Sequence, residues 1–165
     1  MAIQEAFIAE LKHECALTRK MLERVPMEKK DWKPHEKSMS LGRIATHLSD
    51  TIKWASVISN TEVFDFATVK SFGFVAASYQ DLMQLFDTAL VNAIADLSKM
   101  TDDDFEKVWE VRRGEQVLFS THKKAAIRGW VISHMIHHRG QLSVYLRLLD
   151  VPVPGMYGPS ADEKM

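Results

Sequence analysis

Apolar residues recur every three or four positions along most of this chain, which is the period of an α-helix. Only five prolines and seven glycines interrupt the pattern among 165 residues. The sequence therefore predicts an all-α fold. With 46% hydrophobic residues, a chain of this length can bury one substantial core, so we expect a single domain that spans residues 1–165.

Four long helices are predicted, because capping serines and helix-ending prolines bracket the periodic stretches. They cover about residues 2–24, 40–59, 78–99 and 121–149. The second and fourth of these helices each carry a stripe of apolar residues along one side. We therefore expect the four helices to pack against one another through these apolar sides.

Two connections are longer than usual. Residues 60–77 are predicted to form an irregular crossover that packs onto the helices through its phenylalanines, because a long connection normally has a structural purpose. These phenylalanines are Phe64, Phe66, Phe72 and Phe74. Residues 105–120 leave two alternatives open, since they could continue a helix or form two short extended segments joined around Gly114.

Charge and hydropathy argue against two classes of partner. The 21 basic residues nearly balance the 22 acidic ones, which gives a net charge of −1 and no excess positive charge to follow a phosphate backbone. Nucleic acid is therefore not expected as a partner. No apolar run approaches the roughly 18 residues that span a bilayer, so no membrane association is expected either.

A single cysteine, Cys15, cannot form an internal disulfide. It lies among apolar positions of the first predicted helix, and we interpret it as a packing residue. The N-terminal residues lack the basic start and unbroken apolar stretch of a secretory signal. These features together predict a cytoplasmic protein.

Two histidines in the fourth predicted helix, His134 and His138, stand four residues apart and so lie one turn apart on one face. This is the spacing of a two-ligand metal clip. On a helical wheel His138 lies nearer than His137 to the apolar stripe, so we choose His138 as the second ligand. His47 lies on the buried stripe of the second helix and could meet this pair.

A single buried histidine is more often a packing residue than a ligand. Three converging imidazoles would each need a separate partner in an apolar core, whereas one divalent ion satisfies all three. The spacing therefore favours a site formed by His47, His134 and His138. Three imidazoles suit zinc or nickel, and also iron or manganese, and they leave coordination positions for water or substrate.

Other polar residues could line a pocket around this ion. Asp50 follows His47 by three residues and could orient an imidazole, although a solvated carboxylate on the helix face is the simpler interpretation. Gln141 and Tyr157 are further candidates. Arg139 suggests a substrate anchor, yet it lies on the far side of the wheel from His134, and a surface or partner contact is an equal alternative.

Three segments resemble the DinB and YfiT-like superfamily of metal-binding four-helix bundles. They are SLGRIATHL at residues 40–48, WVISHMIHHRGQL at 130–142 and YLRLLDVPVPGMYGPS at 145–160. The resemblance covers nearly the whole chain in order. The H-x3-H-R-G-Q-L segment followed by Y-L-R is far more specific than a bare histidine pair.

The resemblance implies that His47, His134 and His138 are the metal ligands. It also implies an up-down-down-up four-helix bundle, with the long crossover between the second and third helices, and a homodimer. Characterised relatives include transferases and isomerases that use a low-molecular-weight thiol, such as mycothiol or bacillithiol. A thiol transferase, or a hydrolase that activates water, acting on a small-molecule substrate is therefore the first functional hypothesis.

Two alternatives remain open from the sequence. The chain could be a non-enzymatic, stress-associated metal-binding bundle that acts through protein partners. It could also be an ordinary helical bundle in which the histidines pack without metal.

Overall fold

The computed structural model describes residues 2–69 and 73–164, and most of them are helical. The α-helices are α1 (Ile3–Leu22), α2 (Leu41–Asp50), α3 (Lys53–Asn60), α4 (Tyr79–Leu97), α5 (Asp102–Glu106), α6 (Lys123–Ala126) and α7 (His134–Leu148). A π-helical segment, η3 (Ile127–Ser133), joins α6 to α7, and short 3₁₀ turns occur at η1 (Met27–Lys29) and η2 (Phe66–Thr68). The strands are β1 (Val63–Asp65), β2 (Val108–Arg113) and β3 (Gln116–His122).

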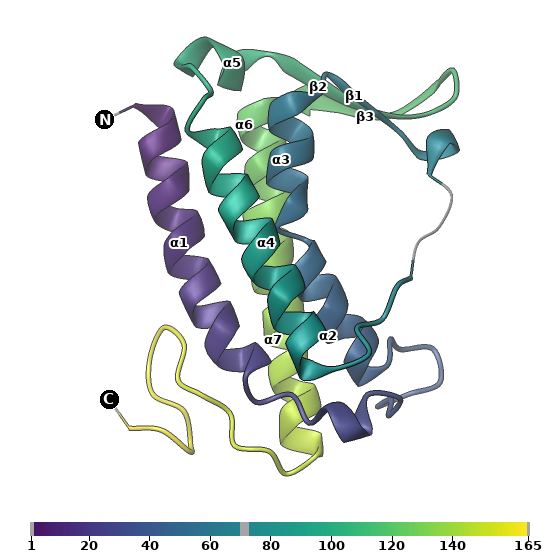
Figure 1. The fold of residues 1–165 in the computed structure, drawn as a ribbon, viewed down its shortest axis with the longest axis vertical. Helices are drawn as coiled ribbons and strands as arrows, with labels where there is room; N and C mark the ends of the chain where they lie inside the picture. Colours follow the sequence, from purple (N-terminus) through teal and green to yellow (C-terminus); the bar gives the residue numbers. More distant parts are fainter. Residues whose placement is uncertain (1, 70–72, 165) are drawn as a thin grey trace.

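The long helical segments lie side by side (Figure 1). One segment is α1, the second is α2 continued by α3, the third is α4, and the fourth is α6 continued through η3 into α7. The chain runs along α1 in one direction, returns through α2 and α3, repeats that second direction in α4 and turns back through α6 to α7 (Figure 1). All four predicted helical regions are thus helical, but the second is broken.

The break between α2 and α3 has a local cause. The Thr51 hydroxyl donates a hydrogen bond to the His47 carbonyl at 2.7 Å, and the Ser49 hydroxyl donates to the Ala45 carbonyl at 3.1 Å. Such hydroxyl groups compete for the carbonyls that hold a helix and often bend it. The α-helix is consequently interrupted after Asp50, shortly after His47, and resumes at Lys53 as α3.

A three-stranded sheet covers one end of the helices, so the strict all-α prediction is wrong. Strand β2 pairs antiparallel with β3 and parallel with β1, which lies in the crossover after α3. Gly114 has a φ of 60°, a left-handed conformation that glycine adopts without strain, and this allows the tight turn between β2 and β3. The extended alternative for residues 105–120 is therefore confirmed for this hairpin.

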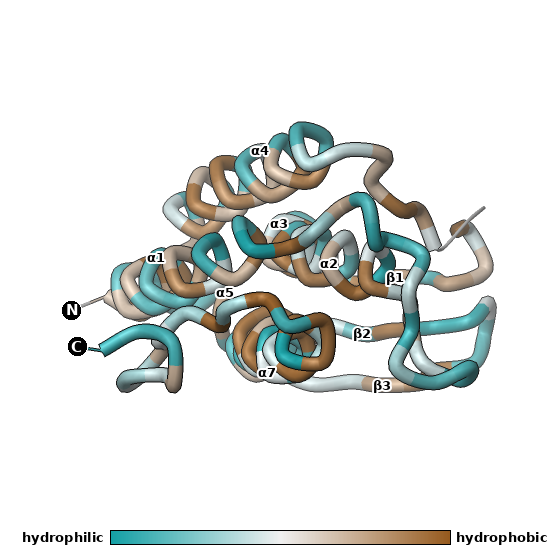
Figure 2. The backbone as a smooth tube through the Cα atoms, turned by 90° about the horizontal axis from the view of Figure 1, so that it is seen from below, coloured by the Kyte–Doolittle hydropathy of each residue, from teal (hydrophilic) through white to brown (hydrophobic). Residues whose placement is uncertain are grey.

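The apolar faces of the helices form one core (Figure 2). Fully buried side chains from every layer meet there, including Leu22, Ile44, Phe86 and Trp109. Cys15 is 1% exposed, which confirms it as a packing residue, and burial raises the pKa of its thiol to about 12. Among the described residues no helix is both long and apolar enough to cross a membrane.

The crossover packs onto the helices through only part of its aromatic content. Phe64 and Phe66 are half-buried, and the ring of Phe64 lies 4.7 Å from that of Trp54. Phe74 is 65% exposed, so its predicted packing is wrong. Phe72 lies outside the described residues.

Candidate metal centre

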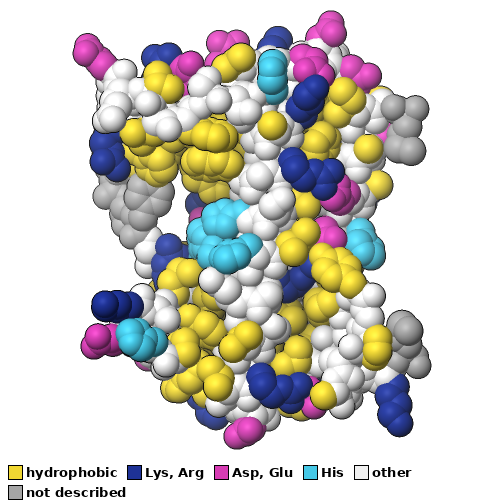
Figure 3. All heavy atoms as spheres, turned by 180° about the vertical axis from the view of Figure 1, so that it is seen from behind, with side chains coloured by type: hydrophobic (Ala, Val, Ile, Leu, Met, Phe, Trp, Pro, Cys, Tyr) yellow, Lys and Arg dark blue, Asp and Glu magenta, His cyan; other side chains and the backbone are white. Residues whose placement is uncertain are grey.

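Three histidine side chains meet at the middle of the helical region. His47 comes from the last turn of α2, and His134 and His138 come from the first two turns of α7. The Nε2 atom of His134 lies 3.3 Å from that of His47 and 2.8 Å from that of His138. Ligand atoms of all three residues lie within 4.8 Å of one another. Figure 3 shows histidine side chains gathered beside a hollow in one face of the molecule.

Hydrogen bonds outside the cluster orient two of the rings. His138 Nδ1 lies 2.8 Å from the Gln141 side-chain oxygen, which can only accept, so Nδ1 carries the proton. The ring of His134 is hydrogen-bonded to the backbone of Trp130, and because its Nε2 faces the other histidines, this contact uses Nδ1. In both neutral rings the proton is on Nδ1, and the Nε2 lone pairs face each other.

Two lone pairs 2.8 Å apart repel unless a positive charge lies between them. A divalent transition metal supplies that charge, and imidazole Nε2 is among its commonest ligands. Nitrogen ligands about 2.0 Å from a tetrahedral ion lie about 3.3 Å apart. The His47–His134 separation already has this value, the His134–His138 pair needs to open by about half an ångström, and the ligand atoms of His47 and His138 lie within 4.8 Å of each other. The donor set therefore fits a metal ion.

Burial keeps the three rings neutral. The pKa of His47 is lowered to about 4, first by desolvation and then by the neighbouring rings of His138 and His134. Desolvation is also the main cause that lowers the pKa values of His134 and His138. Because metal competes with protons for the same nitrogen atoms, rings that are neutral at pH 7 are ready to bind it.

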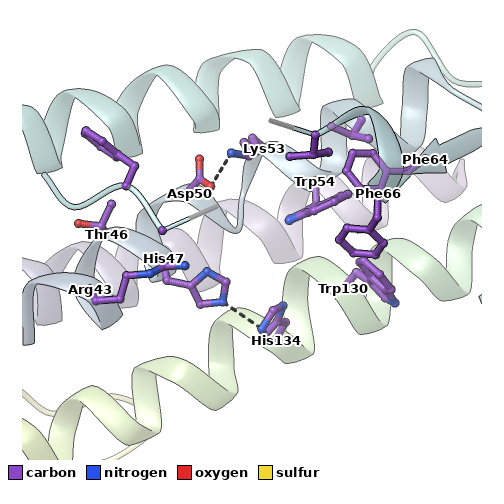
Figure 4. A pocket seen from close by; sticks show the side chains of 14 residues that line it. Arg43, Thr46, His47, Asp50, Lys53, Trp54, Phe64, Phe66, Trp130 and His134 are labelled. Atoms are coloured by element: carbon purple, nitrogen blue, oxygen red, sulfur yellow. Dashed lines mark hydrogen bonds and ion pairs between the residues drawn. The ribbon is translucent and has the colours of Figure 1, made fainter. Parts of the chain in front are cut away.

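A pocket of about 630 Å³ opens onto the histidines (Figure 4). Its volume is in the range of small-molecule sites. His47 and His134 both line it, so an ion held by the triad would be accessible to a bound molecule. The other lining residues are Arg43, Thr46, Asp50, Lys53, Trp54, Val57, Phe64, Phe66, Val69, Gly73, Phe74 and Trp130.

The remaining predicted site residues have separate positions. Asp50 lines the pocket, but its carboxylate pairs with Lys53 at 2.5 Å. Gln141 contacts the triad from outside through His138. The Tyr157 hydroxyl instead donates to the Glu14 carboxylate at 2.7 Å and contacts Arg139, and this places it with α1.

Arg139 is neither a surface residue nor a substrate anchor. It is 2% exposed, and its guanidinium pairs with the Glu14 carboxylate at 2.6 Å. It also donates to the Glu14 carbonyl at 2.9 Å and the Thr18 hydroxyl at 3.1 Å. The helical wheel placed Arg139 opposite His134, and that position faces α1 and not solvent.

A sequence profile of the DinB family matches residues 3–164. The chain belongs to the DinB family. Among curated proteins it is similar to the uncharacterized protein YrdA of Bacillus subtilis (strain 168). The two are 28% identical over 163 residues, which cover 95% of this chain and 89% of YrdA.

Two solved structures of DinB-like proteins share the fold. One is from Bacillus cereus ATCC 10987, with a TM-score of 0.72 and 22% identity, over 94% of this chain and 98% of that one. The other is YjoA from Bacillus subtilis, with a TM-score of 0.68 and 18% identity, over 90% of this chain and 96% of that one. These likenesses confirm a DinB-like fold.

Replacing Gln141 with leucine should weaken zinc binding by about 10-fold or more, because the outer hydrogen-bond partner fixes the tautomer of a ligand histidine. Gln141 is exposed, so the change should leave the fold intact. Isothermal titration calorimetry with zinc measures the effect, and Gln141→Glu, which keeps an acceptor, is the matched control. Equal affinities of the leucine variant and the original protein would contradict this role.

The metal-free protein should lose stability as the pH falls from about 6.5 toward 4. The unfolded chain protonates its histidines near pH 6.5, whereas folded His47 stays neutral until about 4. The unfolded state binds more protons in this interval, so stability is fully present above it and declines through it. Urea unfolding with a chelator at several pH values measures this trend. His47→Leu should flatten it, and an unchanged slope in that variant would refute the assignment.

Proposed function

We propose that this protein is a divalent-metal-dependent transferase that uses a low-molecular-weight thiol, with His47, His134 and His138 as the metal ligands. The observation that carries the proposal is the convergence of three imidazoles, two with Nε2 lone pairs directed at each other, at one side of a small-molecule-sized pocket. Family membership and the resemblance to thiol-dependent relatives support the reaction class.

Zinc or nickel suits three imidazole ligands best, with iron or manganese as alternatives. When bound, such an ion supplies Lewis acidity that lowers the pKa of a coordinated thiol or water toward neutral. The chain's own residues prepare the site. Burial keeps the imidazoles neutral, Gln141 holds the tautomer of His138, and half-buried aromatic residues line one side of the pocket.

In the proposed reaction, the thiol sulfur forms a bond to an electrophilic carbon of the acceptor. The leaving group departs with the electron pair of the broken bond, and the thiol proton passes to solvent. A hydrolase in which water replaces the thiol would use the same site. The opening of the pocket onto His47 and His134 favours either reaction over a purely structural ion, because a structural site has no accessible coordination position.

The finer architectural assignments are part of this proposal. We assign the four helical segments to an up-down-down-up four-helix bundle, in keeping with the directions in Figure 1. We also propose a homodimer and a cytoplasmic location, which the resemblance to the family and the sequence pattern support. Sedimentation of the purified protein at several concentrations tests the homodimer.

Turnover tests the proposed reaction. Untagged protein loaded with zinc or nickel is mixed with a panel of thiols and electrophilic acceptors, and loss of free thiol is followed. Metal-dependent thiol consumption is the expected result. Stoichiometric metal together with no reaction toward any thiol, but a raised melting temperature, would instead support the non-enzymatic metal-binding bundle. A metal content near zero with no metal-induced thermal shift would support histidines that pack without metal.

A further inference from the structure

One wall of the pocket is aromatic. Trp54 comes from α3, Phe64 from β1, Phe66 from η2 and Trp130 from η3, and all four line the cavity while remaining only half-buried. Trp54 is central, because the centroid of its ring lies 4.7 Å from that of Phe64 and 5.4 Å from that of Trp130. Phe66 lies 5.2 Å from Phe64. We call these four residues the aromatic wall.

The aromatic wall is distinct from the core behind it. Trp109 packs against Trp54 and Trp130 and is completely buried, so the core is already filled on that side. Apolar surface that faces a cavity and stays exposed to water is unfavourable in free energy. An apolar surface of this kind, rimmed by polar residues, is typical of a ligand site.

The pocket also carries charge, and Arg43 lies at the end away from the aromatic wall (Figure 4). Asp50 pairs with Lys53 at 2.5 Å, and those two charges cancel. Arg43 also lines the pocket, and no carboxylate within residues 2–69 and 73–164 forms an ion pair with its guanidinium. Among the described lining residues, Arg43 therefore carries the one uncompensated positive charge. An arginine is well suited to bind a carboxylate, because its planar fork donates two parallel hydrogen bonds.

The histidines lie between these two features. Figure 4 shows Arg43 on one side of His47 and His134, and the aromatic residues on the other. Burial is the main cause that lowers the pKa values of His47 and His138, and the charge of Arg43 is a smaller cause that acts in the same direction on both, which agrees with this proximity. A molecule that contacts both ends of the pocket must therefore pass directly beside the triad.

We propose that the acceptor substrate is a ring-bearing organic monoanion. Its carboxylate binds Arg43, its ring packs against the aromatic wall, and the atoms between them lie beside His47 and His134. This inference rests on the proposed function for the identity of the reaction, but it makes a claim about binding that does not need metal. The cavity volume of about 630 Å³ is large enough for a molecule with two fused rings.

Calorimetric titration of the metal-free protein with 2-naphthoate tests the proposal. The neutral 2-naphthylmethanol has the same ring without the charge, and butanoate has the charge without the ring. We expect 2-naphthoate to bind at least about 10-fold more tightly than either compound. A charge-assisted hydrogen bond contributes about that factor relative to the alcohol, and burial of the ring contributes it relative to butanoate. The chelator-treated protein is used because a carboxylate could otherwise bind the metal itself.

Variants separate the two contacts. Arg43→Met should weaken 2-naphthoate binding about 10-fold without changing binding of the neutral alcohol, and Arg43→Lys should have an intermediate effect. Phe66→Leu should weaken both naphthyl compounds equally. Arg113→Met removes an exposed arginine from the β2–β3 hairpin and is the matched control, for which no change is expected. Circular dichroism confirms that each variant is folded.

The outcomes distinguish this inference from the proposed function. Zinc binding without any preference for 2-naphthoate would overturn the substrate class alone. Preference for 2-naphthoate without zinc binding would support the substrate class and overturn the metal-dependent reaction. If Arg43→Met weakens the anion and the neutral alcohol equally, Arg43 has only a structural role and the assignment of the carboxylate is wrong.

Discussion

His134→Ala is expected to abolish stoichiometric zinc binding and, with it, any thiol transfer. His134 is the central member of the triad, because its Nε2 lies within 3.3 Å of those of both His47 and His138. Loss of an outer partner of a ligand costs 10- to 100-fold in metal affinity, so loss of the central ligand should cost more than about 100-fold. Elemental analysis of untagged protein and calorimetric titration measure the change.

His137→Ala provides the matched control. His137 is an exposed histidine on the same helix, and its ring lies 4.9 Å from that of His138 without belonging to the triad. Its replacement should leave zinc stoichiometry and affinity unchanged. The ligand assignment would be untenable if His134→Ala retained one tightly bound zinc per chain, or if the two variants lost zinc equally.

Arg139→Leu is expected to destabilise the protein by about 3–5 kcal/mol, because it leaves the buried Glu14 carboxylate without its counter-charge. The Arg139 and Glu14 side chains are only 3% and 7% exposed, so solvent cannot compensate. Urea unfolding at pH 7 measures the loss. Arg24→Leu is the control, because Arg24, just after the end of α1, also pairs with a carboxylate, that of Glu163, but both partners are substantially exposed. Its effect should be much smaller.

A double variant tests the coupling of this pair directly. Glu14→Gln combined with Arg139→Leu no longer buries an unpaired carboxylate, so it should be more stable than Arg139→Leu alone. If the two single effects simply added, Glu14 and Arg139 would not interact energetically, and the contribution assigned to the ion pair would be wrong.

The helices were largely predictable because their cause is local. Apolar spacing and the caps at Ser40 and Ser78 lie within each segment. The structure confirms both caps, because the serine hydroxyls accept hydrogen bonds from the backbone N–H groups of Arg43 and Asp81. The sheet was only partly predictable. The hairpin around Gly114 could be suspected from its residues, whereas β1 is three residues long and exists because β2 is available to pair with it.

The histidine cluster could be predicted from positions on helical faces. Spacing of four residues places His134 and His138 on one side of α7, and the apolar stripe of α2 carries His47 toward them. The same wheel misjudged Arg139, because a position opposite the triad faces α1 and not solvent. A helical wheel gives the direction of a side chain but does not show which element lies there.

The residues that could bind a metal are readable from the sequence, because the direction of a side chain on a helix follows from the helical period. The surroundings of the three histidines depend on how distant segments pack together. The aromatic wall comes from four separate elements, Arg43 lacks an ion-pair partner in the described chain, and Gln141 fixes the tautomer of His138. The aromatic wall brings together residues that are distant in sequence. It forms only when the helices and strands pack together, and that packing depends on the shape of the whole core.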